Sequence, residues 1–151
     1  LSPAIQYLID SWQKRHSATK CRFVSDGDFE ELAENVNITI FRLVQEGLTN
    51  ITKHANAKNI EIALHRISND DSFEFIEVLI KDDGVGIEEL HLSQLFHRFY
   101  RVDTARSRQL GGTGLGLAIV KSIIDEHKGQ INIEKRDVGA TIKITLPILQ
   151  N

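Results

Sequence analysis

The sequence predicts a two-layer α/β domain, in which helices pack on one sheet around a single core. Three segments repeat their apolar residues with the 3.6-residue period of an amphipathic helix, and five shorter segments partly alternate apolar with polar residues as half-buried strands do. The length of 151 residues fits one domain, and 41% hydrophobic with 26% charged residues is ordinary for a globular protein. We therefore expect one domain over residues 1–151.

Composition argues against several classes of function. The formal net charge is −3, so the chain lacks an overall positive field to hold nucleic acid or an acidic membrane surface. No apolar run approaches the roughly 18 residues of a membrane span. The single cysteine, Cys21, cannot form an internal disulfide, which suits a reducing, cytoplasmic setting. Because the chain begins at Leu1 and contains no methionine, we expect a fragment of a larger protein.

The N-terminal segment predicts a helix, a strand and a turn. The helix is expected over Ala4–His16, with Ser2 as its cap and Pro3 in its first turn. A brief strand follows over Lys20–Ser25. The acidic segment Asp26–Glu31 is expected to be a turn. It is not expected to bind calcium, because it lacks the glycine and the distal glutamate that a calcium loop requires.

The strongest helix signal covers Ala33–Ala55. Its apolar residues recur at spacings of one, three and four: Ile40, Phe41, Val44, Leu48, Ile51 and Ala55. At about 100° per residue, the polar residues Arg42, Glu46, Asn50 and Lys53 fall on the opposite side. The helix should therefore pack one face on a sheet and present the other to something else.

Two strands are expected next, over Asn59–Arg66 and Phe73–Lys81, with a polar hairpin turn at Ile67–Ser72. A short apolar stretch, Leu90–Tyr100, and an arginine-rich loop, Arg101–Gly112, follow.

The C-terminal part predicts a helix and a hairpin. A second amphipathic helix is expected over Leu115–His127, where Gly129 is well placed to end it. The final hairpin pairs Ile131–Lys135 with Thr141–Leu146 and turns at Arg136–Ala140.

Two glycine clusters are the most informative motifs. Asp82–Gly86 reads D-D-G-V-G, and Leu110–Leu117 reads L-G-G-T-G-L-G-L. Glycine lets the backbone approach a ligand closely and adopt positive φ without strain. Both clusters follow the helix that carries Glu46 and Asn50, and this ordered set predicts a pocket for an anionic nucleotide.

These motifs resemble the ATP-binding catalytic domain of bacterial sensor histidine kinases, in the superfamily that includes gyrase, Hsp90 and MutL. The resemblance rests on four boxes: an asparagine box at Phe41–Ala57, a D-x-G-x-G box at Asp82–Gly86, a phenylalanine box at Phe96–Arg101 and a G-T-G-L-G-L box at Gly112–Leu117. The asparagine box has the wording of the nitrate/nitrite-sensor branch, whereas Leu95–Lys121 is similar to the osmosensor and phosphate-sensor type. The resemblance implies a Bergerat-type fold, with a mixed, mostly antiparallel five-stranded sheet, three helices on one face and an ATP lid.

Roles for the polar residues follow from this resemblance. Asp82 would accept a hydrogen bond from the adenine amino group, which guanine lacks at that position. Asn50 would ligate Mg²⁺, a hard cation that takes oxygen ligands. Glu46 would orient a metal-bound water or polarise the acceptor, and Lys53 would contact a phosphate. The alternatives are a solvated helix face and an ordinary turn before Gly84, for which Asp83 is the better candidate.

Further nucleotide contacts are implied along the same motifs. Backbone groups at Gly84, Gly86, Gly112, Gly114 and Gly116 would approach the nucleotide, with a helix N-terminus directed at the triphosphate. The other implied contacts are Arg98, Tyr100, Arg101, Thr113, Leu115, Leu117 and Thr141. His54 either contacts a phosphate or stabilises the helix end. Arg106 and Arg108 are expected to be solvated lid charges, and Phe96 and Phe99 to anchor the lid in the core.

The implied function is transfer of the γ-phosphoryl group of Mg-ATP to a histidine of a partner helical dimerisation domain, absent from this chain. A response regulator would then receive it, and the domain could belong to the cytoplasmic part of a membrane-bound sensor. Three alternatives stay open: an ATP-hydrolysing conformational ATPase in which Glu46 activates water, an anti-sigma-type serine kinase acting mainly by binding, and a non-catalytic module.

Overall fold

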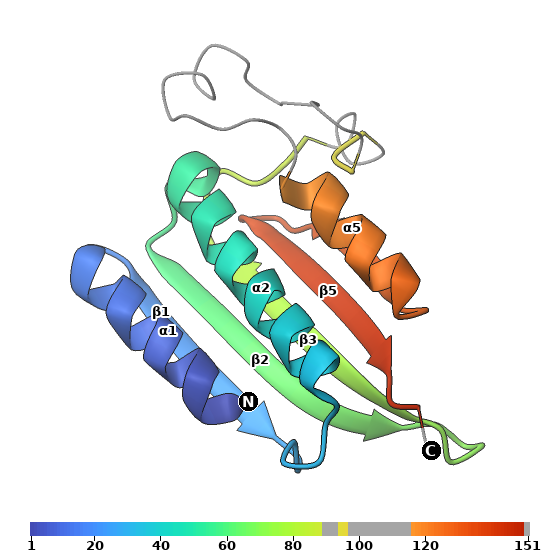
Figure 1. The fold of residues 1–151 in the computed structure, drawn as a ribbon. Helices are drawn as coiled ribbons and strands as arrows, with labels where there is room; N and C mark the ends of the chain where they lie inside the picture. The colour runs from blue at the N-terminus through green and yellow to red at the C-terminus, as the bar shows by residue number, and fades with distance from the viewer. Residues whose placement is uncertain (89–93, 97–115, 150–151) are drawn as a thin grey trace.

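The computed structural model describes residues 1–88, 94–96 and 116–149. Along the chain the elements are α1 (Ser2–Arg15), β1 (Lys20–Asp26), α2 (Glu34–Asn50), the π-helical turn η1 (Ile51–Ala55), β2 (Asn59–Ser68), β3 (Glu74–Asp82), α5 (Gly116–Glu126), β4 (Gln130–Lys135) and β5 (Ala140–Pro147) (Figure 1). Within this part of the chain, no helix is long and apolar enough to cross a membrane.

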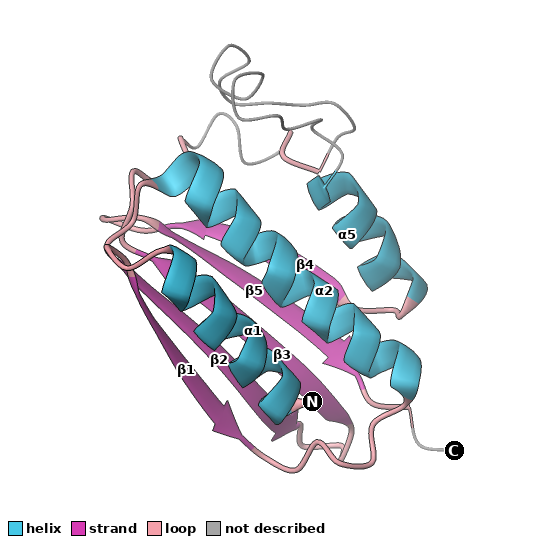
Figure 2. Cartoon of the chain, turned by 60° about the vertical axis from the view of Figure 1, so that its left-hand side comes forward, coloured by secondary structure: helices cyan, strands magenta, loops and turns pink. Residues whose placement is uncertain are grey.

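The five strands form one sheet in the order β1-β2-β3-β5-β4. β1 pairs with β2 in parallel, and the other three pairs are antiparallel. The helices α1, α2 and α5 lie on the same face of this sheet (Figure 2). The predicted two-layer architecture and the mixed, mostly antiparallel sheet are therefore confirmed.

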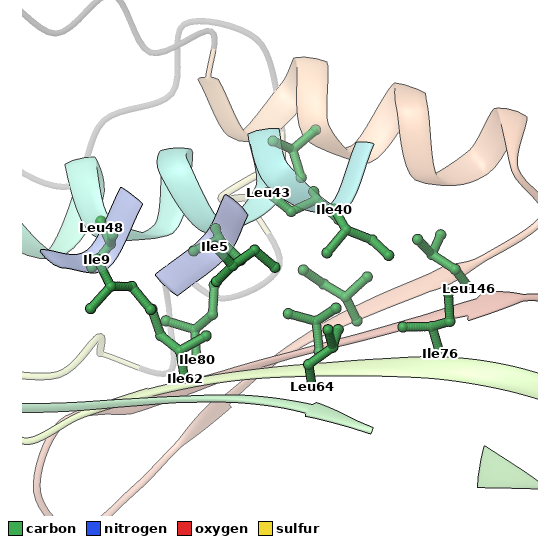
Figure 3. Close-up of a cluster of buried hydrophobic side chains, with 14 of the residues drawn as sticks. Ile5, Ile9, Ile40, Leu43, Leu48, Ile62, Leu64, Ile76, Ile80 and Leu146 are labelled. Atoms are coloured by element: carbon green, nitrogen blue, oxygen red, sulfur yellow. The ribbon is translucent and has the colours of Figure 1, made fainter. Parts of the chain in front are cut away.

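The core fills the space between the sheet and the helices. Successive side chains of a strand point to opposite faces, and the even-numbered positions of β2 and β3 face the helices, where Ile62, Leu64, Ile76 and Ile80 are buried. Figure 3 shows these side chains meeting others from α1 and α2: Ile5, Ile9, Ile40, Leu43 and Leu48. Each such side chain contributes about 1.5–3 kcal/mol relative to an exposed position. This packing fixes the height of α2 above the strands.

The start of α1 differs from the prediction. Ser2 is the first residue of the helix, Leu1 is the cap, and no side chain caps the first turn. The Ser2 hydroxyl instead lies 2.8 Å from the hydroxyl of Ser25 on β1, so Ser2 ties the helix to the sheet edge. Pro3 lies in the first turn, as predicted.

The long predicted helix is one segment with two geometries. The α-helix ends at Asn50, and Ile51–Ala55 continues as a π-helical turn. Asn56 then adopts left-handed backbone angles, with φ of +50° and ψ of +43°, and ends the segment. The apolar period predicts the extent of the segment, whereas it does not distinguish α from π geometry.

The end of α5 also differs from the prediction. Lys128 takes the left-handed conformation, with φ of +57°. The N–H groups of Gly129 and Lys128 donate to the carbonyl oxygens of Ile124 and Asp125 at 2.9 and 3.0 Å, a Schellman arrangement. Gly129 does not supply the left-handed residue that ends the helix. A glycine is needed there because a Cβ would lie 2.6 Å from the Thr145 carbonyl oxygen.

Candidate nucleotide site

A buried carboxylate stands at the end of β3. Asp82 is the last residue of that strand and is 8% exposed. Its side chain is on the helix-covered face, because it has the same parity as Ile80, and its Oδ1 accepts a 2.9 Å hydrogen bond from the Gly84 N–H. Burial raises the pKa of the Asp82 carboxyl above its ordinary value, while the backbone N–H groups of Gly84 and Ala140 offset part of that rise. Such a group readily accepts a further donor.

The loop after Asp82 is held by close backbone contacts at three glycines. A Cβ on Gly84 would lie 2.1 Å from the Ala55 carbonyl oxygen, where Val85 N–H donates at 2.8 Å. Gly86 has φ of +73° and packs on Gly139, which has φ of +78°. A Cβ on Gly139 would lie 1.9 Å from the Asp82 carbonyl oxygen. These contacts join the end of η1, the loop and the β4–β5 turn around the carboxylate.

Asp83 does more than form a turn. Its carboxylate accepts hydrogen bonds from the backbone N–H groups of Lys58 and Asn59 at 2.8 and 2.9 Å, and from the Asn59 side-chain amide at 2.8 Å. These donors hold the pKa of Asp83 below its usual range. Asp83 therefore fixes the start of β2 against the end of β3, which supports the position of Asp82.

The polar face of α2 carries the predicted metal and phosphate residues. Glu46, Asn50 and Lys53 are half-buried, whereas Arg42 is exposed. The Asn50 amide nitrogen is buried and has no hydrogen-bond partner within the described chain. An amide can turn by 180° to exchange its oxygen and nitrogen, so Asn50 offers an unsatisfied polar group suited to a ligand. No cluster of three or more His, Cys, Asp or Glu among the described residues forms a separate metal site.

The position of Asn50 follows from how α2 crosses β3. A Cβ on Gly47 would lie 2.6 Å from Ile80 Cδ1, and Ala55 contacts Gly84. Asn50 lies between these two contacts along the helix, on the stretch that approaches Asp82. The structure thus brings Asn50 and Asp82 to the same end of the fold.

A pocket separates α2 from α5 above the sheet. Its walls include Glu46 and Gly47 from α2 and Leu117 and Val120 from α5, and its floor is formed by Ile80, Ile131, Ile142 and Ile144. Two predicted site residues, Glu46 and Leu117, therefore face one space. With a volume of about 10 Å³ and a mostly apolar lining, this pocket has room for a water and not for a nucleotide, so the position of the nucleotide between the helices stays a prediction.

The strand register moves one predicted contact away from the site. Thr141 is opposite Lys81 on β3 and Glu134 on β4, so it is one position out of phase with Asp82. Alternate residues point to opposite faces, and the Thr141 side chain is therefore on the face without helices. This register does not favour the predicted contact of the Thr141 side chain with the nucleotide, which stays a prediction.

Several predicted residues lie outside the described residues: Arg98, Phe99, Tyr100, Arg101, Arg106, Arg108, Gly112, Thr113, Gly114 and Leu115, with the lid they would form. Gly116 begins α5. Phe96 packs partly buried against the core, and its role in anchoring the lid stays a prediction. His54 is exposed in the last turn of η1 beside Lys53. Gly139 is a supporting residue that sequence reasoning missed, and its position in a predicted hairpin turn was the available signal.

Residues 35–150 match the family described as histidine kinase-, DNA gyrase B-, and HSP90-like ATPase. The chain belongs to this family. It is 49% identical over 77 residues to the sensor histidine kinase WalK of Bacillus subtilis (strain 168), covering 49% of this chain and 12% of that protein. It is 40% identical over 104 residues to the sensor protein kinase WalK of Staphylococcus aureus, covering 66% of this chain and 24% of the relative. The chain is an ATP-binding catalytic domain of the histidine-kinase type, and these matches span under a quarter of each relative's length.

Solved structures share the fold. The mycobacterial sensor histidine kinase MprB superposes with a TM-score of 0.70 at 24% identity, covering 97% of this chain and 93% of that chain. Full-length ShkA in complex with AMPPNP gives a TM-score of 0.72 at 16% identity, covering 99% of this chain and 30% of that chain. These likenesses confirm the predicted arrangement of helices and sheet.

Proposed function

We propose that this domain binds Mg-ATP between α2 and α5 and donates the γ-phosphoryl group to a histidine on a helical dimerisation domain of its parent protein. The observation that carries the proposal is that a buried carboxylate, Asp82, and a buried amide without a partner in the described chain, Asn50, lie at the same end of the fold. Neither group is placed there for stability, because burying polar groups without full partners costs free energy.

Asp82 would select the base. Its carboxylate can only accept hydrogen bonds when ionised, and the adenine amino group is a donor. Guanine presents a carbonyl oxygen at that position, so two acceptors would face each other and GTP would be disfavoured. A donor from adenine would also favour the ionised carboxylate and offset its burial.

Asn50, Lys53 and Glu46 would handle the phosphates. Mg²⁺, when bound, neutralises charge on the phosphate oxygens, and the Asn50 amide oxygen fits a cation that keeps most of its waters. Lys53 places a positive charge less than one helical turn further along, where it would attract phosphate. A neutral imidazole acceptor already has a lone pair, so Glu46 needs only to orient the acceptor or a water.

Nucleotide titration by calorimetry tests the binding site. We expect one-to-one binding of ATP in the presence of Mg²⁺, with GTP much weaker. Asp82→Asn should weaken ATP binding by roughly 10- to 100-fold, because a hydrogen bond to a charged group contributes about 1.5–3 kcal/mol. Asp10→Asn, on the exposed face of α1, is the matched control. Equal binding of ATP by Asp82→Asn and the control would contradict the base-reading role.

The full parent protein tests the transfer step. After incubation with γ-labelled ATP, we expect a protein-bound label that is stable to alkali and lost in acid, as for phosphohistidine, and absent from Asn50→Ala. An acid-stable label on serine would instead identify a serine kinase, and phosphate release without a labelled protein would identify a hydrolysing ATPase. Passage of the label to a response regulator, and the cytoplasmic location of the domain, belong to the same proposal.

A further inference from the structure

The π-helical turn η1 lies directly beside the proposed phosphate-binding residues. It begins at Ile51, immediately after Asn50, and its last turn carries Lys53 and His54. π turns are rare, occur mostly as single turns inside α-helices and are frequent at functional sites. The position of Lys53 relative to Asn50 therefore depends on whatever contacts keep this turn from relaxing to an α-helix.

A hydrogen-bonded chain from α1 reaches the middle of this turn. The Trp12 indole Nε1–H donates to the Thr52 hydroxyl at 3.1 Å, and the same hydroxyl donates to the Leu48 carbonyl oxygen at 2.8 Å. Thr52 thus adds a donor to a carbonyl in the last turn of α2, which also accepts from the Ile51 N–H, and it accepts in turn from a different helix. Linked hydrogen bonds of this kind strengthen one another.

The donor side of this chain is rigid. Trp12 is 6% exposed and belongs to the core cluster with Ile5 and Ile9. The His16 ring stacks on the indole with centroids 4.4 Å apart and planes 17° apart, and His16 Nδ1 lies 2.8 Å from the Trp12 carbonyl oxygen. The indole N–H is therefore aimed from a fixed position.

We propose that Trp12 and Thr52 are positioning residues that hold η1 in its π geometry and thereby place Lys53 for the phosphates of the nucleotide. The inference rests on the proposed function, because it concerns the same site. Neither residue would contact the ligand. Their effect should be larger at the phosphate end of the nucleotide than at the base end, because backbone N–H groups of Gly84 and Ala140 also hold the Asp82 carboxylate.

The test compares four single variants and one double variant by calorimetric titration of ATP and AMP in the presence of Mg²⁺. Thr52→Val removes the hydroxyl, Thr52→Ser retains it, and Trp12→Phe removes the donor while keeping an aromatic ring. Thr49→Val is the matched control, since the Thr49 hydroxyl makes the same type of bond to the Gln45 carbonyl oxygen at 3.0 Å. We expect Thr52→Val and Trp12→Phe to weaken ATP binding roughly 3- to 10-fold, and AMP binding less than 2-fold.

The pattern of these results decides the inference. We expect Thr52→Ser to bind ATP with the affinity of the unaltered domain. The double variant, Trp12→Phe with Thr52→Val, should lose no more ATP affinity than the weaker-binding single variant, because both substitutions break the same hydrogen-bonded series. The inference is overturned if Thr52→Val binds ATP like Thr49→Val, or if ATP and AMP weaken equally. If the unaltered domain binds ATP and Asp82→Asn weakens that binding, the proposed function stands whichever way the Thr52 and Trp12 variants behave. Absence of ATP binding by the unaltered domain would overturn both.

Discussion

Replacing Gly139 by alanine should damage the fold and the nucleotide site together. The new Cβ would lie 1.9 Å from the Asp82 carbonyl oxygen, 2.6 Å from its carbon and 2.9 Å from Asp83 Cα, so backbone atoms must move apart. A non-glycine residue at φ of +78° adds about 1–2 kcal/mol, and overpacking adds about 1–3 kcal/mol. The sum, about 2–5 kcal/mol, is a large fraction of the usual 5–15 kcal/mol of total stability.

Two measurements separate these effects. Thermal unfolding should show a fall in Tm of roughly 4–20 °C, the shift expected for that loss in a domain of this size. Titration of ATP at a temperature where the variant is still folded should show weaker binding, because the displaced backbone carries the Asp82 carboxylate.

Gly27→Ala is the control for strain alone. Gly27 has φ of +124°, and its Cβ would lie 2.6 Å from Arg66 Cβ, at the end of β2 away from Asp82. We expect this variant to lose stability and to keep its nucleotide affinity. If Gly139→Ala unfolds at the temperature of the unaltered domain, or loses no more affinity than Gly27→Ala, the reasoning about this contact is refuted.

Two further predictions concern the adjacent carboxylates. Asp82→Asn should raise the free energy of unfolding of the ligand-free domain near pH 7, because burial raises the pKa of Asp82. Because the pKa of Asp82 is higher in the folded domain than in the unfolded chain, the free energy of unfolding falls as pH rises from roughly 4 through the folded pKa. Denaturant titrations across that range should show this fall in the unaltered domain and a smaller fall in Asp82→Asn. Parallel plots of unfolding free energy against pH for the two proteins would contradict the prediction. Asp83→Ala should cost about 1–2 kcal/mol, since three donors lose their acceptor. Because the pKa of Asp83 is lowered, its contribution should vanish as pH falls through that lowered value, and an unaltered denaturation midpoint at neutral pH would exclude the role.

The sequence predicts the elements well because each carries a local signal. The apolar period of Ala33–Ala55 and the alternation in the strands give the layers directly, and turn residues such as Asn69 mark the β2–β3 hairpin, where its side chain accepts from the Asp71 and Phe73 N–H groups. These are short-range properties. They need no knowledge of what lies across the sheet.

The features that the sequence did not predict depend on distant parts of the chain. A one-residue change of register moves a side chain to the other face of a sheet, which is why Thr141 could not be distinguished from Ala140 without the β3–β5 pairing. The π turn that begins at Ile51 makes contacts with α1, through Thr52, and with the loop after Asp82, through Ala55, and neither contact can be read from the local sequence. The role of Asp83 depends on the start of β2, more than twenty residues earlier in the chain.

The two ends of the sheet differ in how well their polar groups are satisfied. At the β2–β3 hairpin, Arg66 and Glu74 form a two-bonded ion pair at 3.1 and 2.7 Å, and the Asn69 side chain completes the turn. At the opposite end, Asp82 is buried with a raised pKa and Asn50 has a buried amide without a partner in the described chain. Local conflicts of this kind concentrate at functional sites, where a ligand supplies what the fold lacks. An adenine donor would satisfy Asp82, and a phosphate oxygen that accepts from the Asn50 amide nitrogen, or a cation on the Asn50 oxygen once the amide has turned, would satisfy Asn50. The arrangement that weakens the free domain is therefore the one that favours the nucleotide-bound state.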